Sequence, residues 1–240
     1  MMDSSRPTRR QLVGGGLSLL GAALAIRPTL GHALALIRTP SQSRGPFYPT
    51  QLPLDHDNDL VQVAGRPGLA RGRITNVIGR VLTESGRPVA GARVEIWQCN
   101  AWGRYHHPRD TRDAPLDPNF QGYGQTVTGP DGAYRFRTIK PVPYPGRTPH
   151  IHYAVSGPGF GPLITQLYVE GEPGNEHDVL LNSIRDPRAR QSLIVPFVPD
   201  PDSARGELVA RFDLVLADDG RLSRADDEYW MVTRAPRSRG

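Results

Sequence analysis

Two histidines separated by one residue, His150 and His152, have the side chains and the spacing that could bind a metal ion together. Residues two apart in a β-strand point to the same face, so both imidazoles would enter one site while Ile151 packs on the other face. Pro149, directly before the pair, fits the entrance of a strand. The pair predicts a metal site, but a His-x-His pair also occurs on exposed strands, so further ligands are needed.

Tyrosines are the remaining candidates for those ligands. The chain has a single cysteine, Cys99, no HExxH motif and no carboxylate at third-ligand spacing from the pair, so zinc-hydrolase patterns lack support. Tyr144 lies six residues before His150, and Tyr105 lies in a Gly-Arg-Tyr-His-His run. A phenol with a solution pKa of about 10 is a poor ligand for a divalent ion at neutral pH, whereas a trivalent ion can hold it as phenolate. Tyrosine ligands therefore indicate ferric iron.

The elements that must position these side chains are short strands. With 26 Gly and 24 Pro among 240 residues, the chain is rich in turns, and its length allows one domain with a sizeable core. Helical periodicity is absent beyond the N-terminal segment. Strand-like runs bounded by turn signals lie at 73–82, 92–97, 133–137, 151–155, 164–169, 192–198 and 209–216.

These runs predict an all-β fold, an antiparallel β-sandwich of about seven to nine strands. Long loops such as 100–126 are expected to carry function.

The N-terminus has the organisation of an export leader. Arg9 and Arg10 precede an apolar, glycine-rich run at 14–25, and two Ala-Leu-Ala runs offer cleavage sites. The apolar run is about a dozen residues long, against roughly 20 for a spanning helix, so no stable membrane anchor is expected after the leader is removed. We expect a twin-arginine-type signal peptide and linker over 1–37, a catalytic domain over 38–240, and a periplasmic or extracellular protein.

Charge and cysteine content narrow the partners. The formal net charge is +5, and the basic residues are nearly all arginine, with Lys140 the only lysine. No basic block with interleaved aromatics is present, which argues against nucleic acid as a partner. Cys99 is alone, so no internal disulfide can form even in an oxidising compartment. Its place beside Trp97 predicts a buried thiol without a catalytic role.

Four runs of the chain together resemble the intradiol ring-cleavage dioxygenases, in a compact, exported, protocatechuate 3,4-dioxygenase-like branch. The longest spans 79–105 and ends in Gly-Ala-Arg-Val-Glu-Ile-Trp-Gln-Cys-Asn-Ala-Trp-Gly-Arg-Tyr. The others are Phe-Gln-Gly-Tyr-Gly at 120–124, Asp-Gly-Ala-Tyr-Arg-Phe-Arg-Thr-Ile-Lys-Pro at 131–141, and Arg-Thr-Pro-His-Ile-His at 147–152. The resemblance covers roughly residues 45–200.

This resemblance implies a mononuclear non-haem Fe(III) dioxygenase. Its substrates would be O2 and a catechol-type diol, cleaved between the two hydroxyls to a muconate-type diacid. The implied metal ligands are Tyr105, Tyr144, His150 and His152.

The resemblance also assigns three catalytic residues. Tyr144 would leave the metal and accept a substrate proton, Arg147 would stabilise negative charge on the ring, and Gln166 would orient the substrate or dioxygen. The loop of 145–149 is shorter than in the protocatechuate and catechol enzymes, which reshapes the pocket. The helical dimerisation region of the catechol enzymes is missing, and a homo-oligomer stays an open possibility.

Two alternatives belong to other classes. The run at 86–96 also occurs in non-catalytic prealbumin-like and carbohydrate-binding sandwiches, which have no need of four convergent ligands. A ferrous oxygenase would require two histidines and one carboxylate, and no such carboxylate accompanies the pair. His106 and His107 are expected to be solvated loop residues.

Overall fold

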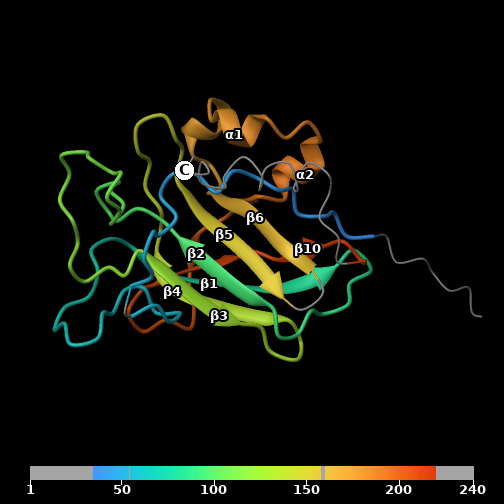
Figure 1. The fold of residues 1–240 in the computed structure, drawn as a ribbon, viewed down its shortest axis with the longest axis horizontal. Coiled ribbons are helices and arrows are strands. Elements are labelled where there is room, and N and C mark those ends of the chain that lie inside the picture. The colour runs from blue at the N-terminus through green and yellow to red at the C-terminus, as the bar shows by residue number, and fades with distance from the viewer. Residues whose placement is uncertain (1–34, 54, 158–159, 220–240) are drawn as a thin grey trace, which may run out of the picture. The chain divides into compact units, whose positions relative to one another are not determined.

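The computed structural model describes residues 35–53, 55–157 and 160–219, and these form the expected all-β sandwich (Figure 1). Two five-stranded sheets make up the fold. The first sheet contains β1 (Ile74–Thr83), β4 (Ala133–Ile139), β8 (Val198–Pro199), β9 (Leu208–Arg211) and β10 (Leu214–Leu216). The second contains β2 (Arg93–Trp97), β3 (Tyr123–Val127), β5 (His150–Gly157), β6 (Phe160–Val169) and β7 (Ile194–Val195).

The pairing within the sheets is mixed. In the first sheet β4 runs antiparallel to β1, while β9 and β10 pair in parallel with successive parts of β1, and β8 runs antiparallel to β9. The second sheet has the order β3-β2-β5-β6-β7 and is antiparallel except for the β6 and β7 pair. The purely antiparallel expectation is therefore wrong at the short C-terminal strands. These strands reach the sheets by crossovers and not by hairpins.

The strand predictions are confirmed for β1, β2, β4, β5 and β6 within a few residues. The run at 192–198 is divided, because Pro196 has no amide hydrogen for a ladder. The run at 209–216 is divided at Phe212 and Asp213. The sequence pattern missed β3, which lies at the end of the expected 100–126 loop and brings the described strands to ten.

Three helical turns occur in the segment after β6, which is orange in Figure 1. They are η1 (Pro173–Glu176), α1 (Val179–Asn182) and α2 (Pro187–Gln191). Each is too short to show helical periodicity in the sequence. None of the helices in the described part of the chain is long and apolar enough to cross a membrane.

Both faces of the second sheet are buried. Alternate residues of β2 and β5 face the first sheet and form the main core with residues such as Val77 and Phe136. The opposite face carries a second cluster, in which Trp97, Tyr105 and Tyr123 pack with partly buried aromatic residues. This outer face belongs to the side of β5 that carries His150 and His152. A site there is shielded from water without lying in the main core.

Residues 38–43 run along the sandwich. Thr39 donates its amide hydrogen to Val215 of β10, and Gln42 donates its own to Ile164 of β6. The segment therefore bonds to both sheets. The expected leader lies outside the described residues, apart from residues 35–37.

The chain between β9 and β10 lies so close to β1 that Gly79 has no space for a side chain. A Cβ atom there would lie 1.8 Å from the carbonyl oxygen of Phe212, which also accepts a hydrogen bond from Tyr134. Gly79→Ala is expected to lower the free energy of unfolding by about 3 kcal/mol, measured by urea denaturation. Gly129→Ala, whose Cβ would meet nothing closer than 3.4 Å, is the control and should change it by less than about 0.5 kcal/mol. Equal stability of the two variants would contradict the close contact between Gly79 and Phe212.

Candidate metal centre

The two histidines point to the same face at the start of β5. Their Nε2 atoms lie 3.2 Å apart, and both side chains are buried. His150 donates from Nδ1 to the carbonyl oxygen of Thr148 at 2.7 Å. A hydrogen on Nδ1 leaves the Nε2 lone pair of a neutral imidazole free to bind a cation. Both histidines direct Nε2 toward one shared position, and the hydrogen bond at Nδ1 prepares that of His150 to bind.

Burial keeps these imidazoles neutral. Loss of solvation, followed by the nearby Arg147 charge, lowers the pKa of His150 to about 3. Burial, then His150, lowers the pKa of His152 well below its usual range. Neutral imidazoles are the form that binds metals, so the site needs no deprotonation step at these residues at neutral pH.

Two tyrosine rings complete the cluster. The Tyr105 ring centroid lies 5.7 Å from that of Tyr144 and 6.3 Å from that of His152, and the Tyr144 centroid lies 5.4 Å from that of His150. Tyr105 is held by a hydrogen bond from its backbone amide to the buried carboxylate of Asp110, at 2.7 Å. The structure thus brings together the four expected ligands from β5 and two loops.

The buried environment of the two phenols favours the binding of a highly charged cation. Burial raises the pKa of Tyr105 well above its usual range and also raises the pKa of Tyr144. The Tyr105 hydroxyl is buried and has no hydrogen-bond partner, and Nδ1 of His152 has none either. A buried polar atom without a partner is costly, and a bound cation would satisfy the phenol as phenolate. The donor set fits ferric iron on this ground.

Aromatic packing holds the ligands in place. Trp97 stacks on His152 with ring centroids 4.9 Å apart and planes 5° apart, as their paired positions on β2 and β5 require. Phe47 stacks on Tyr105 at 4.7 Å. Arg112 lies over the Tyr144 ring at 4.7 Å and forms an ion pair with Asp110. Sequence reasoning did not assign Phe47, Arg112 or Asp110 to the site.

Arg147 is held on two sides beside the ligands. Its Nε donates to Asp178 at 2.8 Å, and its Nη2 donates to Gln166. The remaining nitrogen, Nη1, lies 3.4 Å from Nε2 of His150. One edge of the guanidinium therefore faces the position that the ligands share. The side chain is mostly buried, so its charge acts with little screening by water.

The sequence analysis missed Asp178, which is fully buried. Besides Arg147, it accepts from the backbone amides of Thr148, Leu180 and Leu181. The last two contacts make it the N-cap of α1. An Asp before a short apolar run is a signal for an N-cap, but nothing in that signal indicates an arginine 31 residues earlier.

Gln166 is also fully buried, and protein groups occupy both polar ends of its amide. Its oxygen accepts from Arg147 and Tyr168, and its nitrogen donates to the carbonyl oxygen of Ser43 at 2.9 Å. The described contacts place it as a support for Arg147 and for the N-terminal segment.

His107 is not the solvated residue that was expected. It is 8% exposed and packs edge-on against Phe47, while His106 is exposed as expected. The prediction of a buried thiol at Cys99 is confirmed. Among the described residues, no group of three or more His, Cys, Asp or Glu side chains could hold a metal. The ligand set of a ferrous two-histidine, one-carboxylate oxygenase is therefore absent from that part of the chain.

Comparison with known proteins places this arrangement in a family. The sequence profile described as Dioxygenase matches residues 43–218. The protocatechuate 3,4-dioxygenase beta chain of Burkholderia cepacia is 42% identical over 176 residues, which cover 70% of this chain and 67% of that one. The chain belongs to the intradiol ring-cleavage dioxygenase family. The family assignment confirms the resemblance of the four sequence runs and disfavours a non-catalytic sandwich module.

Other members of the intradiol family show the same relationship. Hydroxyquinol 1,2-dioxygenase of Rhizobium sp. is 30% identical and is matched over 79% of this chain and 65% of its own length. The dioxygenase domain of a carbohydrate-binding fusion protein from Streptomyces sp. SirexAA-E has 32% identity and a TM-score of 0.55, over 75% of this chain and 99% of that domain. The chain spans about two thirds of the length of the curated relatives.

Gly45 offers a test of how closely the N-terminal segment packs on the centre. Its φ of 69° suits glycine, and a Cβ there would lie 3.1 Å from Cε1 of His152, which Trp97 already backs. Gly45→Ala is expected to displace the imidazole by a few tenths of an ångström and to weaken iron binding about tenfold, measured by competition with a chelator.

The control for this prediction is Gly65→Ala. Gly65 has a similar φ of 74°, but a Cβ there meets no atom within 4 Å. Both variants carry the backbone strain of about 1 kcal/mol, and only Gly45→Ala should change the metal affinity. Equal iron affinity in the two variants would show that the segment does not press on His152.

Proposed function

We propose that the chain is a ferric intradiol dioxygenase that cleaves catechol-type diols between their two hydroxyls. The observation that carries this proposal is the convergence of two neutral imidazoles, through Nε2, with a buried phenol that has no hydrogen-bond partner. We assign Tyr105, Tyr144, His150 and His152 as the ligands of one ferric ion.

The relatives support the substrate class. The two described above are named for protocatechuate and hydroxyquinol, and both names denote aromatic rings with adjacent hydroxyls. We therefore assign a catechol-type diol and O2 as the substrates of this chain. Tyr144, which precedes the short loop of 145–149, is half-buried, and we expect this loop to shape the pocket.

The chain's own residues have distinct parts in this reaction. When held by these four residues, ferric iron would supply Lewis acidity and an electron acceptor that make a diol reactive toward O2. Tyr144 is the more exposed phenol, and if the ion held it as phenolate, its oxygen would be suited to take a proton from a substrate hydroxyl. Arg147 presents Nη1 beside His150, where it can stabilise negative charge on the bound ring. Tyr105 and Trp97 are buried and pack beside His152.

The proposal is tested on the purified mature chain. We expect about one iron per chain, a visible tyrosinate-to-ferric charge-transfer band, and oxygen uptake with at least one member of a catechol panel. Product identification should give a diacid. A chain without iron and without the band would refute the proposed centre, and a semialdehyde product would place cleavage outside the diol.

We also propose export through a twin-arginine-type leader. The motif at Arg9 and Arg10 with the apolar run at 14–25 supports it. Changing both arginines to lysine in the full chain should retain the protein in the cytoplasm. Cell fractionation measures the distribution, and an unchanged distribution would contradict the proposal.

A further inference from the structure

Arg112 lies against the proposed ligand Tyr144, and it comes from the loop of 104–112 that also carries Tyr105. The central carbon of its guanidinium lies 4.7 Å from the centroid of the Tyr144 ring and 5.8 Å from that of Phe47. The face of an aromatic ring carries partial negative charge, and a cation within about 6 Å of the centroid is attracted to it. The closer of the two contacts is the one with the proposed ligand.

Asp110 fixes the position of this guanidinium. Nε of Arg112 donates to Oδ1 of Asp110 at 2.8 Å, and Nη2 donates to Oδ2. Oδ2 also accepts from the backbone amide of Tyr105 at 2.7 Å. One carboxylate thus connects the backbone of one proposed ligand to the cation on the ring of the other.

The ion pair is largely shielded from water. The Asp110 side chain is 1% exposed and that of Arg112 is 27% exposed. A planar guanidinium that a carboxylate holds at two points loses little further freedom when it stacks on a ring. A cation–π contact is also stronger where water is excluded. The contact of Arg112 with Tyr144 should therefore exceed the weak attraction of an exposed pair.

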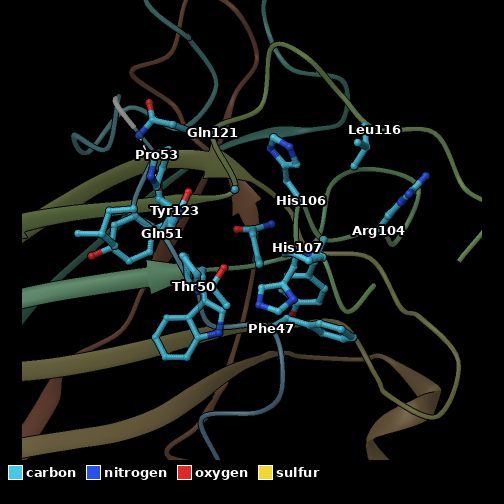
Figure 2. A pocket seen from close by; sticks show the side chains of 17 residues that line it. Phe47, Thr50, Gln51, Pro53, Arg104, His106, His107, Leu116, Gln121 and Tyr123 are labelled. Carbon is cyan, nitrogen blue, oxygen red and sulfur yellow. Dashed lines mark hydrogen bonds between the residues drawn. The ribbon is translucent and has the colours of Figure 1, made fainter. Parts of the chain in front are cut away.

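Two other arginines of the loop differ from Arg112 in their surroundings. In Figure 2 the guanidinium of Arg104 points away from Phe47 and His107, whose rings pack edge-on. Arg109, three residues before Arg112, is exposed. The place of Arg112 over a ligand ring is thus a property of this residue and its partner, and not of the positive charge of the loop.

We propose that Arg112 is a positioning residue of the metal centre, which holds the Tyr144 ring in place and stabilises the electrons of that ring. The role rests on the proposed function, because it concerns a ligand of that centre. In a tyrosinate-to-ferric charge-transfer transition, an electron moves from the ring toward the metal. A cation on the face of the ring opposes this movement and raises the energy of the band.

Arg112→Gln tests this role in the iron-loaded chain, because it removes the charge from the ring. We expect the visible band to move to longer wavelength by about 10 nm or more, and the iron affinity to fall about fivefold, measured by absorption and by competition with a chelator. Arg109→Gln removes an equal charge from an exposed position of the same loop and should change neither quantity.

A second variant covers the case in which Arg112→Gln does not fold, since it leaves the buried Asp110 without its cation. The double variant Asp110→Asn/Arg112→Gln leaves no buried charge unpaired. Its asparagine oxygen can still accept from the amide of Tyr105. A band shift in the same direction is expected.

A measurement without iron separates this role from the proposed function. Fluorotyrosine labelling makes the eight tyrosines of the chain visible by fluorine NMR, and Tyr144→Phe identifies the Tyr144 signal by its loss. In the iron-free chain, Arg112→Gln should shift this signal more than any other tyrosine signal. Arg109→Gln should leave it in place.

The outcomes distinguish the two proposals. A chain that binds no iron but shows the fluorine shift would contradict the proposed function and confirm that Arg112 holds the ring. An iron-loaded Arg112→Gln with an unchanged band, or an unmoved Tyr144 signal, would overturn the role of Arg112. Equal changes in Arg109→Gln would overturn it as well, because they would come from the charge of the loop.

Discussion

Tyr105→Phe is expected to impair the metal centre strongly while leaving the fold intact. The change removes one buried hydroxyl that makes no hydrogen bond in the protein, so the free energy of unfolding should stay the same or rise. The same oxygen is the proposed phenolate ligand. We expect the visible charge-transfer band to weaken and activity to fall by at least about a hundredfold, measured by absorption, iron analysis and oxygen uptake.

Tyr153→Phe is the matched control. Tyr153 neighbours His152 on β5, is fully buried, and also has a hydroxyl without a partner, but its ring faces the main core between the sheets. This variant should keep iron, band and activity. If both variants bind iron equally well, Tyr105 is not a ligand.

Asp178→Asn is expected to give an iron-loaded but poorly active protein. Asparagine caps a helix as well as aspartate does, so the contacts to Leu180 and Leu181 can persist. The change removes the charge that holds Nε of Arg147 and places an amide hydrogen there. Misplacement of a positioned group by about 1 Å can cost a hundredfold in rate, and we expect a loss of that order in kcat/KM.

Asp186→Asn separates capping from positioning. Asp186 caps α2 in the same manner, by accepting from the amide of Arg188, and it is exposed. Its substitution should leave kcat/KM unchanged. The lost ion pair in Asp178→Asn should also lower stability by about 3 kcal/mol, so rates are compared well below its unfolding temperature. Full activity in a folded Asp178→Asn would show that Arg147 is held without it.

Elements with their own periodicity could be predicted from the sequence. Alternation in β5 gave both the strand and the shared face of His150 and His152, because side chains two apart must point the same way. The strand β3 was missed because its pairing with β2 is set by tertiary contacts and not by a clear pattern of its own. The parallel pairing of β9 and β10 depends on the route of the chain, which local sequence does not encode.

The residues of the candidate site also fall into two groups, those that the sequence predicted and those that only the structure revealed. Residue type and motif named the four ligands and Arg147. The supports came only from the structure: Asp178 lies 31 residues from Arg147, and the backbone carbonyl of Ser43 lies 123 residues from Gln166. A backbone oxygen carries no sequence signal at all. Such partners are defined by the fold, so a single sequence cannot indicate them.

The segment that bonds to both sheets limits how far the chain can be shortened from its N-terminal side. Thr39 and Gln42 hydrogen-bond to the sandwich, and Ser43, Gly45 and Phe47 lie against Gln166 and the proposed ligands. A cut beyond Thr39 would remove residues that pack on the proposed centre. The centre is therefore expected to survive only cuts made on the N-terminal side of Thr39.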